Sequence, residues 1–337
     1  RDVERSRGLG DVYKRQGIGL YCRKHATDVN GFVLGGRSVG PWLTAFAYGT
    51  SYFSAVVFVG YAGQFGWRYG IAATWAGIGN AIIGSLLAWV VLGRRTRIMS
   101  QHLDSATMPQ YFGKRFGSNP LKIGASVIIF IFLIPYTASL YNGLSRLFGM
   151  AFNIDYSVCI IIMATLTAIY VIAGGYMATA INDFIQGIIM LFGIVAVIAA
   201  VIHSKGGFMS ALQGLANVSD PAVSDTPGIF ASFFGPDPFN LLCVVILTSL
   251  GTWGLPQMVQ KFYAIDNEAS IQKGTVISTI FALIVSGGCY FLGGFGRLFD
   301  NPVLYNEQGG VIYDGIIPFM LSSLPDILIG VVIVLVL

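Results

Sequence analysis

The sequence predicts an all-α integral membrane protein in which apolar helices cross a bilayer as one bundle. Hydrophobic residues make up 55% of the 337-residue chain and charged residues only 11%, whereas about a quarter of a soluble domain is charged. The mean hydropathy of the chain is +0.70. The hydrophobic residues also gather in runs of about 20 residues, which is the length that a helix needs to cross a hydrocarbon core of ~30 Å.

Eight such segments follow one another along the chain. They span about 41–65, 69–92, 121–148, 156–174, 179–202, 238–260, 274–296 and 317–337. We expect helices throughout, because lipid-exposed strands satisfy their backbone groups only in a closed barrel. The linker SATMPQYFGKRFGSN, residues 105–119, predicts a further short helix at the membrane surface, with Pro109 near its start and Gly117 near its end.

The second segment repeats glycine at every seventh position, at Gly70, Gly77 and Gly84. Its run GIGNAIIG has the appearance of a nucleotide-binding loop, but such a loop follows a strand and has no place within an apolar helix. Small residues on a membrane helix instead allow the backbones of two helices to approach closely. We therefore interpret these glycines as packing positions.

Basic residues are unequally divided between the two sides of the predicted membrane, and cytoplasmic loops are the side that they favour. This places the start of the first segment and the linker 94–120 in the cytoplasm, and the stretches 203–237 and 298–316 outside. The richer side carries Arg23, Lys24, Arg37, Arg94, Arg95, Arg97, Lys114, Arg115, Lys122, Lys261 and Lys273, and the poorer side carries Arg68, Arg146, Lys205 and Arg297.

The two ends of the chain do not fit this pattern. The first residues, RDVERSRGLGDVYKRQ (1–16), are highly charged and have neither a signal-peptide core nor a membrane period. We expect 1–16 to be a non-native leader and 17–337 to be a single membrane domain. The last apolar run stops at Leu337 without a cap or a charge, so we also expect the domain to be truncated at both ends.

Cysteine, histidine and acidic residues do not form a catalytic or metal-binding pattern. The cysteines stand singly, mostly within apolar segments, and no CxxC motif or histidine cluster accompanies them. A membrane enzyme requires several acidic or histidine side chains that converge within the bilayer. We therefore expect neither an enzyme nor a nucleic-acid-binding protein.

Two of the apolar segments are interrupted near their middle. The first contains GTSYFSA (49–55), in which hydroxyl side chains cluster around Gly49, and the sixth contains TSLGTWGLP (248–256), in which Pro256 removes a backbone donor. Isolated hydroxyls can simply bond back to the preceding turn. A pair of interrupted helices at corresponding positions, however, is typical of secondary transporters built from inverted repeats, with the binding site at the midplane.

Asp183 is the acidic residue that lies well inside an apolar segment, in ATAINDFIQGIIM (178–190). A carboxylate within a membrane helix is expensive and therefore suggests a functional role. The alternative is a residue that reaches the cytoplasmic interface from the end of the fifth segment.

Three stretches together resemble the sodium:solute symporter family. LGGRSVGPWLTAFAYGTSYFS (34–54) is similar to the first core helix of that family, IYVIAGGYMATAINDFIQGIIM (169–190) to its signature, and TWGLPQMVQKFYAIDNEASI (252–271) to its sixth core helix. YTASLYNGLSRLF (136–148) is similar as well. The resemblance implies a LeuT-type fold of two inverted five-helix repeats, of which this chain would hold about eight of the ten core helices.

The resemblance also implies site residues. The backbone carbonyls of Thr50 and Phe53 fall at sodium-ligand positions, and Asp183 aligns with a carboxylate implicated in sodium-dependent transport. The solute would bind between the two interruptions and the third segment. The solute-lining residues would be Tyr52, Ser54, Tyr136, Trp253, Gly254 and Gln257.

Two departures from the family's branches leave the solute open. Tyr52 stands where proline transporters have an aspartate, and Leu255 stands where sugar transporters show a polar residue. The resemblance thus implies sodium-coupled symport of a small organic solute across the cytoplasmic (inner) membrane by alternating access, with Na⁺ as the coupling ion and the lipid bilayer as the surroundings. The alternative is a related membrane sensor module that is fused to a signalling domain.

Overall fold

The structure is a computed structural model that describes residues 16–22, 28–53, 56–152, 155–306, 308–322, 324–325, 328–330 and 332. Within these residues the chain forms helices and connecting turns, and the β-pairing consists of isolated bridges, such as that between Val39 and Ile265. The α-helical class predicted from the sequence is confirmed. Ser54 and most of 331–337 lie outside the described residues.

The first predicted segment is broken, as expected. After the short α2 (Val29–Leu34), α3 (Pro41–Tyr52) begins with proline at its first position, where the missing N–H is not needed. It ends before Phe53, whose backbone angles of φ −102° and ψ 70° are not helical. The chain resumes in the π-helix η3 (Val56–Tyr61) and in α4 (Ala62–Tyr69). We call the interruption at Phe53 the first break.

The sixth segment is broken in the same way. It consists of α11 (Pro238–Leu250), the 3₁₀ turn η8 (Gly251–Gly254) and α12 (Pro256–Ala264). Leu255 is extended, with φ −69° and ψ 127°, because the residue before a proline avoids the helical region. The two parts meet at an angle of 53°. The interruption predicted in the sixth segment is confirmed, and we call it the second break.

The other segments are continuous or turn at a glycine. The second runs from η4 (Gly70–Ala73) through α5 (Thr74–Gly79), η5 (Asn80–Leu87) and η6 (Trp89–Gly93) into α6 (Arg94–His102). The third is α8 (Asn119–Phe152), the fourth and fifth form α9 (Tyr156–Ser204), and the seventh is α13 (Glu268–Gly294). Outside these lie α7 (Met108–Phe116), which confirms the short helix predicted in the linker, and α10 (Phe208–Ala216).

Four described helices are long and apolar enough to cross a membrane, or five if the bent pair counts as one span. The sequence predicts more segments because two of these helices, Val56–His102 and Tyr156–Ser204, each contain parts of two predicted segments. The chain turns within them at Gly70 (φ +64°) and at Gly175 (φ +56°). Positive φ is open to glycine at little steric cost, so each glycine permits a hairpin between two spans.

The eighth predicted segment is wrong in its boundaries. The structure has α14 (Tyr313–Ser322), which begins before the predicted start, and residues 324–325 are not helical. Pro325 explains the interruption, since proline cannot donate to a helix and disfavours the helical region for the residue before it. The helix resumes at 328–330. Counting apolar residues alone overlooked this proline.

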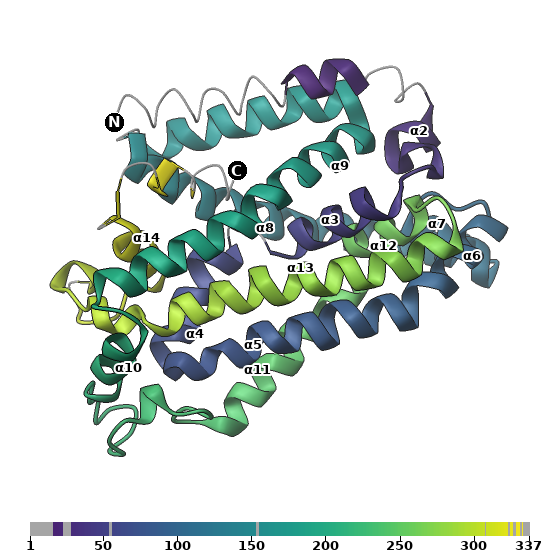
Figure 1. Ribbon diagram of the computed structural model, residues 1–337. Coiled ribbons are helices and arrows are strands. Elements are labelled where there is room, and N and C mark those ends of the chain that lie inside the picture. Colours follow the sequence, from purple (N-terminus) through teal and green to yellow (C-terminus); the bar gives the residue numbers. More distant parts are fainter. Residues whose placement is uncertain are drawn as a thin grey trace.

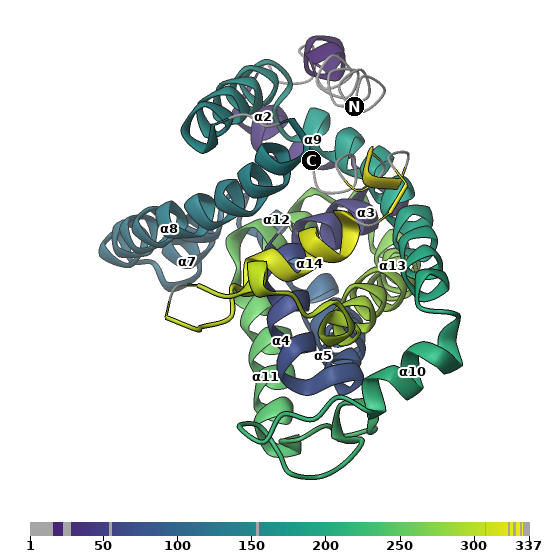
Figure 2. The same cartoon turned by 90° about the vertical axis from the view of Figure 1, so that its left-hand side faces the viewer.

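Glycine brings α4, α5 and α13 into backbone contact at the centre of the bundle. A Cβ atom on Gly66 of α4 would overlap the carbonyl of Gly293 on α13, and one on Gly77 of α5 would lie 2.6 Å from Gly287. The packing role predicted for the glycines of the second segment is confirmed at Gly77. Figure 1 shows α5 and α13 running side by side, whereas Figure 2 shows α7 and α8 at the edge of the bundle.

Candidate functional site

The last turn of α3 leads into the first break. The hydroxyl of Thr50 donates to the carbonyl of Phe46 at 2.9 Å, so this side chain bonds back to its own helix. The amide of Phe53 donates to the carbonyl of Gly49 at 3.0 Å and closes the last turn. Because the final carbonyls of a helix have no partner further along it, the end of α3 can present backbone oxygens to a cation. This is the chemistry predicted for Thr50 and Phe53.

Tyr52 connects three helices rather than lining open space. Its side chain is buried. The hydroxyl donates to the carbonyl of Thr248 on α11 at 2.9 Å and lies 3.2 Å from the amide oxygen of Asn80 on η5. The structure therefore gives the hydroxyl of Tyr52 protein partners on both sides.

The second break gathers three of the predicted residues. Trp253 donates its indole N–H to the carbonyl of Ile83 on η5 at 2.9 Å. Gly254 leaves open space, since no atom lies within 4 Å of the position that a side-chain carbon would take. Both polar atoms of the Gln257 amide are buried, and neither makes a hydrogen bond of standard geometry among the described residues, although the hydroxyl of Tyr136 faces the amide. An unpaired buried amide is costly, which makes Gln257 the most suitable group here to receive a polar solute.

Tyr136 on α8 lies beside Gln257. The structure therefore brings Tyr136 and Gln257 together, and it holds Tyr52 of α3 and Trp253 of η8 against η5. Ser54 lies outside the described residues. A shared solute-lining surface for these residues stays a prediction.

Asp183 on α9 faces Lys261 on α12, with 3.9 Å between the carboxylate Oδ2 and the ammonium Nζ. Lys261 is buried, and its ammonium also lies 4.9 Å from the centre of the Tyr176 ring. A buried lysine requires a compensating charge, and Asp183 supplies it. Lys261 was treated in the sequence as a cytoplasmic surface charge; its position one residue after an apolar run could have suggested a buried role.

Arginines fix those ends of both broken helices that the charge pattern predicts to be cytoplasmic. Arg37, which precedes α3, donates to the carbonyls of Ser105 at 2.7 Å and Tyr263 at 3.3 Å. Arg97 donates to the carbonyls of Ile265 at 2.6 Å and Asp266 at 2.8 Å. Burial lowers the pKa of the Arg37 guanidinium, and the nearby Arg97 lowers it further.

A third arginine holds the opposite end of the first broken helix. The buried Arg297, just after α13, donates to the carbonyl of Trp67 and pairs with Asp220 at 3.0 Å. Its guanidinium also lies 3.9 Å from the centre of the Phe230 ring. Burial lowers the pKa of Arg297, while the hydrogen bond and charge of Asp220 raise it. The first break thus lies in a helix that arginines hold near both of its ends.

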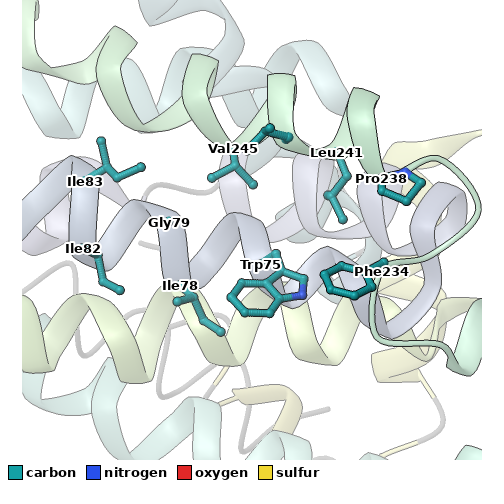
Figure 3. Close-up of a pocket in the computed structure, with 10 residues that line it drawn as sticks. Trp75, Ile78, Gly79, Ile82, Ile83, Phe234, Pro238, Leu241 and Val245 are labelled. Atoms are coloured by element: carbon teal, nitrogen blue, oxygen red, sulfur yellow. The ribbon is translucent and has the colours of Figure 1, made fainter.

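A cavity of about 480 Å³ lies between α5, η5 and α11 (Figure 3). Its walls are apolar, with Trp75 and Phe234 at one end and Ile82 and Ile83 at the other. A polar solute would find no hydrogen-bonding side chain there apart from the indole of Trp75, whose N–H already donates to Phe233. This cavity therefore does not fit the predicted solute site.

Among the described residues, no group of three or more His, Cys, Asp and Glu side chains could hold a metal ion. Backbone carbonyls and hydroxyls are hard oxygen ligands that suit a sodium ion. The first break offers both kinds of group.

Comparisons with known proteins agree with this architecture. A model of the sodium:solute symporter family matches residues 32–337. The osmoregulated proline transporter OpuE of Bacillus subtilis is 29% identical over 87% of this chain and 57% of its own length. The sodium/proline symporter of Escherichia coli is 29% identical over 85% and 56%, respectively. The chain thus spans little more than half the length of these curated relatives.

A solved structure shows the same fold. A Na⁺-coupled sialic acid symporter, in a substrate-bound outward-open state, matches with a TM-score of 0.75 over 99% of this chain and 70% of that chain. Its sequence identity is 16%, so the likeness concerns the fold alone. The LeuT-type helix bundle predicted from the sequence is confirmed.

Proposed function

This chain belongs to the sodium:solute symporter family, and from that premise we propose that it moves a small organic solute across a membrane together with Na⁺. The chain is a multi-pass membrane protein, and we place it in the cytoplasmic membrane of the cell. Residues 17–337 would act as a single domain. The matches reported above are all transporters, so no observation favours a signalling module.

The observation that carries this proposal is the pair of breaks at Phe53 and Leu255, in two helices held against the same partner, η5. Each break interrupts the backbone hydrogen bonds of a helix; Tyr52 and Phe53 at the first break are buried, whereas Gly251 and Gly254 at the second are exposed. Such backbone is tolerated at membrane depth only where it lines a cavity or is covered by protein. Two breaks together provide oxygen ligands for a cation and polar groups for a solute.

Na⁺ would bind at the carbonyls of Thr50 and Phe53. The solute would bind beside the Gln257 amide, in the space next to Gly254, with Tyr136 and Trp253 on either side. These side chains are uncharged, and the buried charge of Lys261 is already matched by Asp183. A net charge on the solute would therefore lack a compensating partner. We propose a solute that is neutral overall or zwitterionic.

The test is uptake of a panel of labelled sugars, amino acids, carboxylates and vitamins by the full-length protein in proteoliposomes. We expect an inward Na⁺ gradient, but not a K⁺ gradient, to drive accumulation of at least one neutral or zwitterionic solute. Gln257→Leu should abolish this uptake. Gln213→Leu, the same change on the exposed face of α10, is the matched control and should leave it intact.

Two results would contradict the proposal. One is equal accumulation of every solute with Na⁺ and with K⁺. The other is full uptake by Gln257→Leu, which would remove Gln257 from the solute site.

A further inference from the structure

Asn80 is a buried amide in the middle of an apolar helix. It is the first residue of η5, and only 1% of its surface is exposed. A polar side chain buried without hydrogen bonds is strongly unfavourable, so a buried amide is expected to be fully engaged. Asn80 has no place among the residues predicted to bind Na⁺ or solute.

Three hydroxyls from both broken helices converge on the amide oxygen of Asn80. The hydroxyl of Tyr52, at the end of α3, lies at 3.2 Å, and those of Thr248 and Ser249, near the end of α11, lie at 3.1 Å. The amide nitrogen donates to Ser286 of α13 at 3.5 Å. One side chain thus touches α3, α11 and α13.

The three hydroxyls do not depend on Asn80 equally. An amide oxygen has two lone pairs, so it cannot accept all three hydrogens at once. The hydroxyl of Tyr52 can donate to the carbonyl of Thr248 instead, and that of Thr248 to the carbonyl of Val244, each at 2.9 Å. Among the described residues, Ser249 has Asn80 as its acceptor. The bond from Ser249 is therefore the one that Asn80 alone sustains.

The backbone of η5 receives further donors from the same two helices. Tyr48 of α3 donates its hydroxyl to the carbonyl of Gly84 at 2.9 Å, and Trp253 at the second break donates to the carbonyl of Ile83. A π-helix shifts its hydrogen bonds by one residue, and such turns are frequent at functional sites. This stretch of η5 is therefore an acceptor surface for both broken helices.

Two glycines allow this close approach. A Cβ atom on Gly84 would overlap the hydroxyl of Tyr52, and one on Gly79 would overlap the side chain of Val245 on α11. Figure 3 shows Gly79 on the helix that faces Val245. Without these glycines, neither broken helix could lie against η5 at its present distance.

We propose that Asn80 is a positioning residue that sets the distance between the two breaks, and thereby the affinity for solute, without touching the solute. This inference rests on the proposed symport, because a solute that binds between the breaks would sense their separation. Loss of the amide would leave the hydroxyl of Ser249 without its acceptor and loosen α11 against η5, while the bond from Tyr52 to the carbonyl of Thr248 still joins α3 to α11. The prediction is specific: solute affinity falls while the rate of the transport cycle is retained.

The test compares Asn80→Ala, Asn80→Ser and Ser278→Ala in the full-length protein. Ser278 is the matched control, because it is equally buried and bonds Ser85 of η5 at 2.8 Å, with no hydrogen bond to either break among the described residues. Two readouts are taken. The first is KM against maximal rate for Na⁺-driven uptake, and the second is hydrogen exchange of the peptides covering 48–53 and 248–255.

For Asn80→Ala we expect a KM increase of about tenfold, the effect of losing one or two net hydrogen bonds, with a maximal rate within about twofold. Both peptides should exchange faster. Asn80→Ser should recover part of both effects, and Ser278→Ala should change neither. If Asn80→Ala does not fold, Ser249→Ala removes the same bond from the other side and should give the same pattern.

An unchanged KM and unchanged exchange in Asn80→Ala would overturn the inference, and so would equal effects from Ser278→Ala. Failure of the proposed function would look different. In that case the unmodified protein would show no Na⁺-driven uptake, while the exchange of 48–53 and 248–255 would still report whether Asn80 holds the two breaks together.

Discussion

The helices α13 and α8 differ in how much of their apolar surface is buried in the bundle. More than half of the most apolar part of α13 is buried, and its glycines meet the backbones of α4 and α5. In α8, no residue of the most apolar window, which lies within the span Asn119–Asn142, is buried. Hydrophobicity alone does not distinguish them, since both qualify as membrane spans. The two helices differ instead in the glycines of α13 that meet other backbones, because small residues permit close helix contact.

This difference indicates which helices move together. Backbones in direct contact cannot slide past each other without overlap, so α4, α5 and α13 are expected to behave as one rigid unit. The exposed α8 has fewer constraints of this kind, although its Tyr136 lies beside Gln257. The following predictions test the contrast, beginning with the largest expected effect.

The largest effect should come from Gly66→Leu on α4. A side chain at this position would overlap the backbone of Gly293, which cannot move aside as a side chain can. We expect loss of the folded, monodisperse protein in size-exclusion chromatography. Gly124→Leu on α8 is the matched control, because nothing lies within 4 Å of its added carbon, and it should elute unchanged. Equal behaviour of the two variants would contradict the contrast.

Phe281→Ala on α13 should come next. Phe281 is buried and packs against Phe46 of α3, with 5.2 Å between the ring centres. Emptying such a site costs about 3–5 kcal/mol, measured as a fall in the free energy of unfolding. Phe130→Ala on α8 removes a largely exposed ring and should change stability by less than about 0.5 kcal/mol. A similar loss in both variants would show that α8 is covered in the folded protein.

Lys261→Met should destabilise the contact between α9 and α12 by about 3 kcal/mol, because it removes the cation that faces Asp183. The double variant Lys261→Met with Asp183→Asn should be more stable than Lys261→Met alone, since no unmatched charge is created. Thermal unfolding in detergent measures both. If Asp183 serves Na⁺ instead, Asp183→Asn alone will lower the apparent Na⁺ affinity of uptake while sparing stability.

The smallest effect should come from Arg94→Gln. Arg94 pairs with Glu268 at 2.6 Å, but both side chains are well exposed to solvent. An exposed ion pair contributes about 0–1 kcal/mol, so thermal unfolding should shift very little. A large destabilisation would show that this pair is covered in the membrane-embedded protein.

The sequence predicts the interrupted helices because their causes are local. Proline at 256 and the glycine and hydroxyl cluster at 49–51 disturb the backbone in which they lie, whatever the rest of the chain does. The glycine turn at Gly175 is local in the same way. The predicted boundaries of the eighth segment are wrong because it was defined by the apolar residues on either side of Pro325, whereas the proline itself interrupts the helix.

The partners of the site residues could not be predicted, because they come from distant parts of the chain. Asn80 stands in GIGNAIIG, and nothing in that run shows that Tyr52, Thr248 and Ser249 would meet it. Tyr52 was interpreted as a solute contact on its alignment position, yet its hydroxyl is occupied by α11 and η5. Only the packing of three helices determines whether a polar side chain faces a ligand or another helix.

Arg37 and Arg97 have a consequence for how this protein can vary. Arg37 and Arg97 donate to the carbonyls of Ser105, Tyr263, Ile265 and Asp266. A carbonyl is present whatever side chain a residue carries, so the residue type at each acceptor position can change while the hydrogen bonds persist. The donors cannot, because no other side chain offers the same planar fork. Substitutions should therefore accumulate at the residues that supply the carbonyls and be rejected at Arg37 and Arg97.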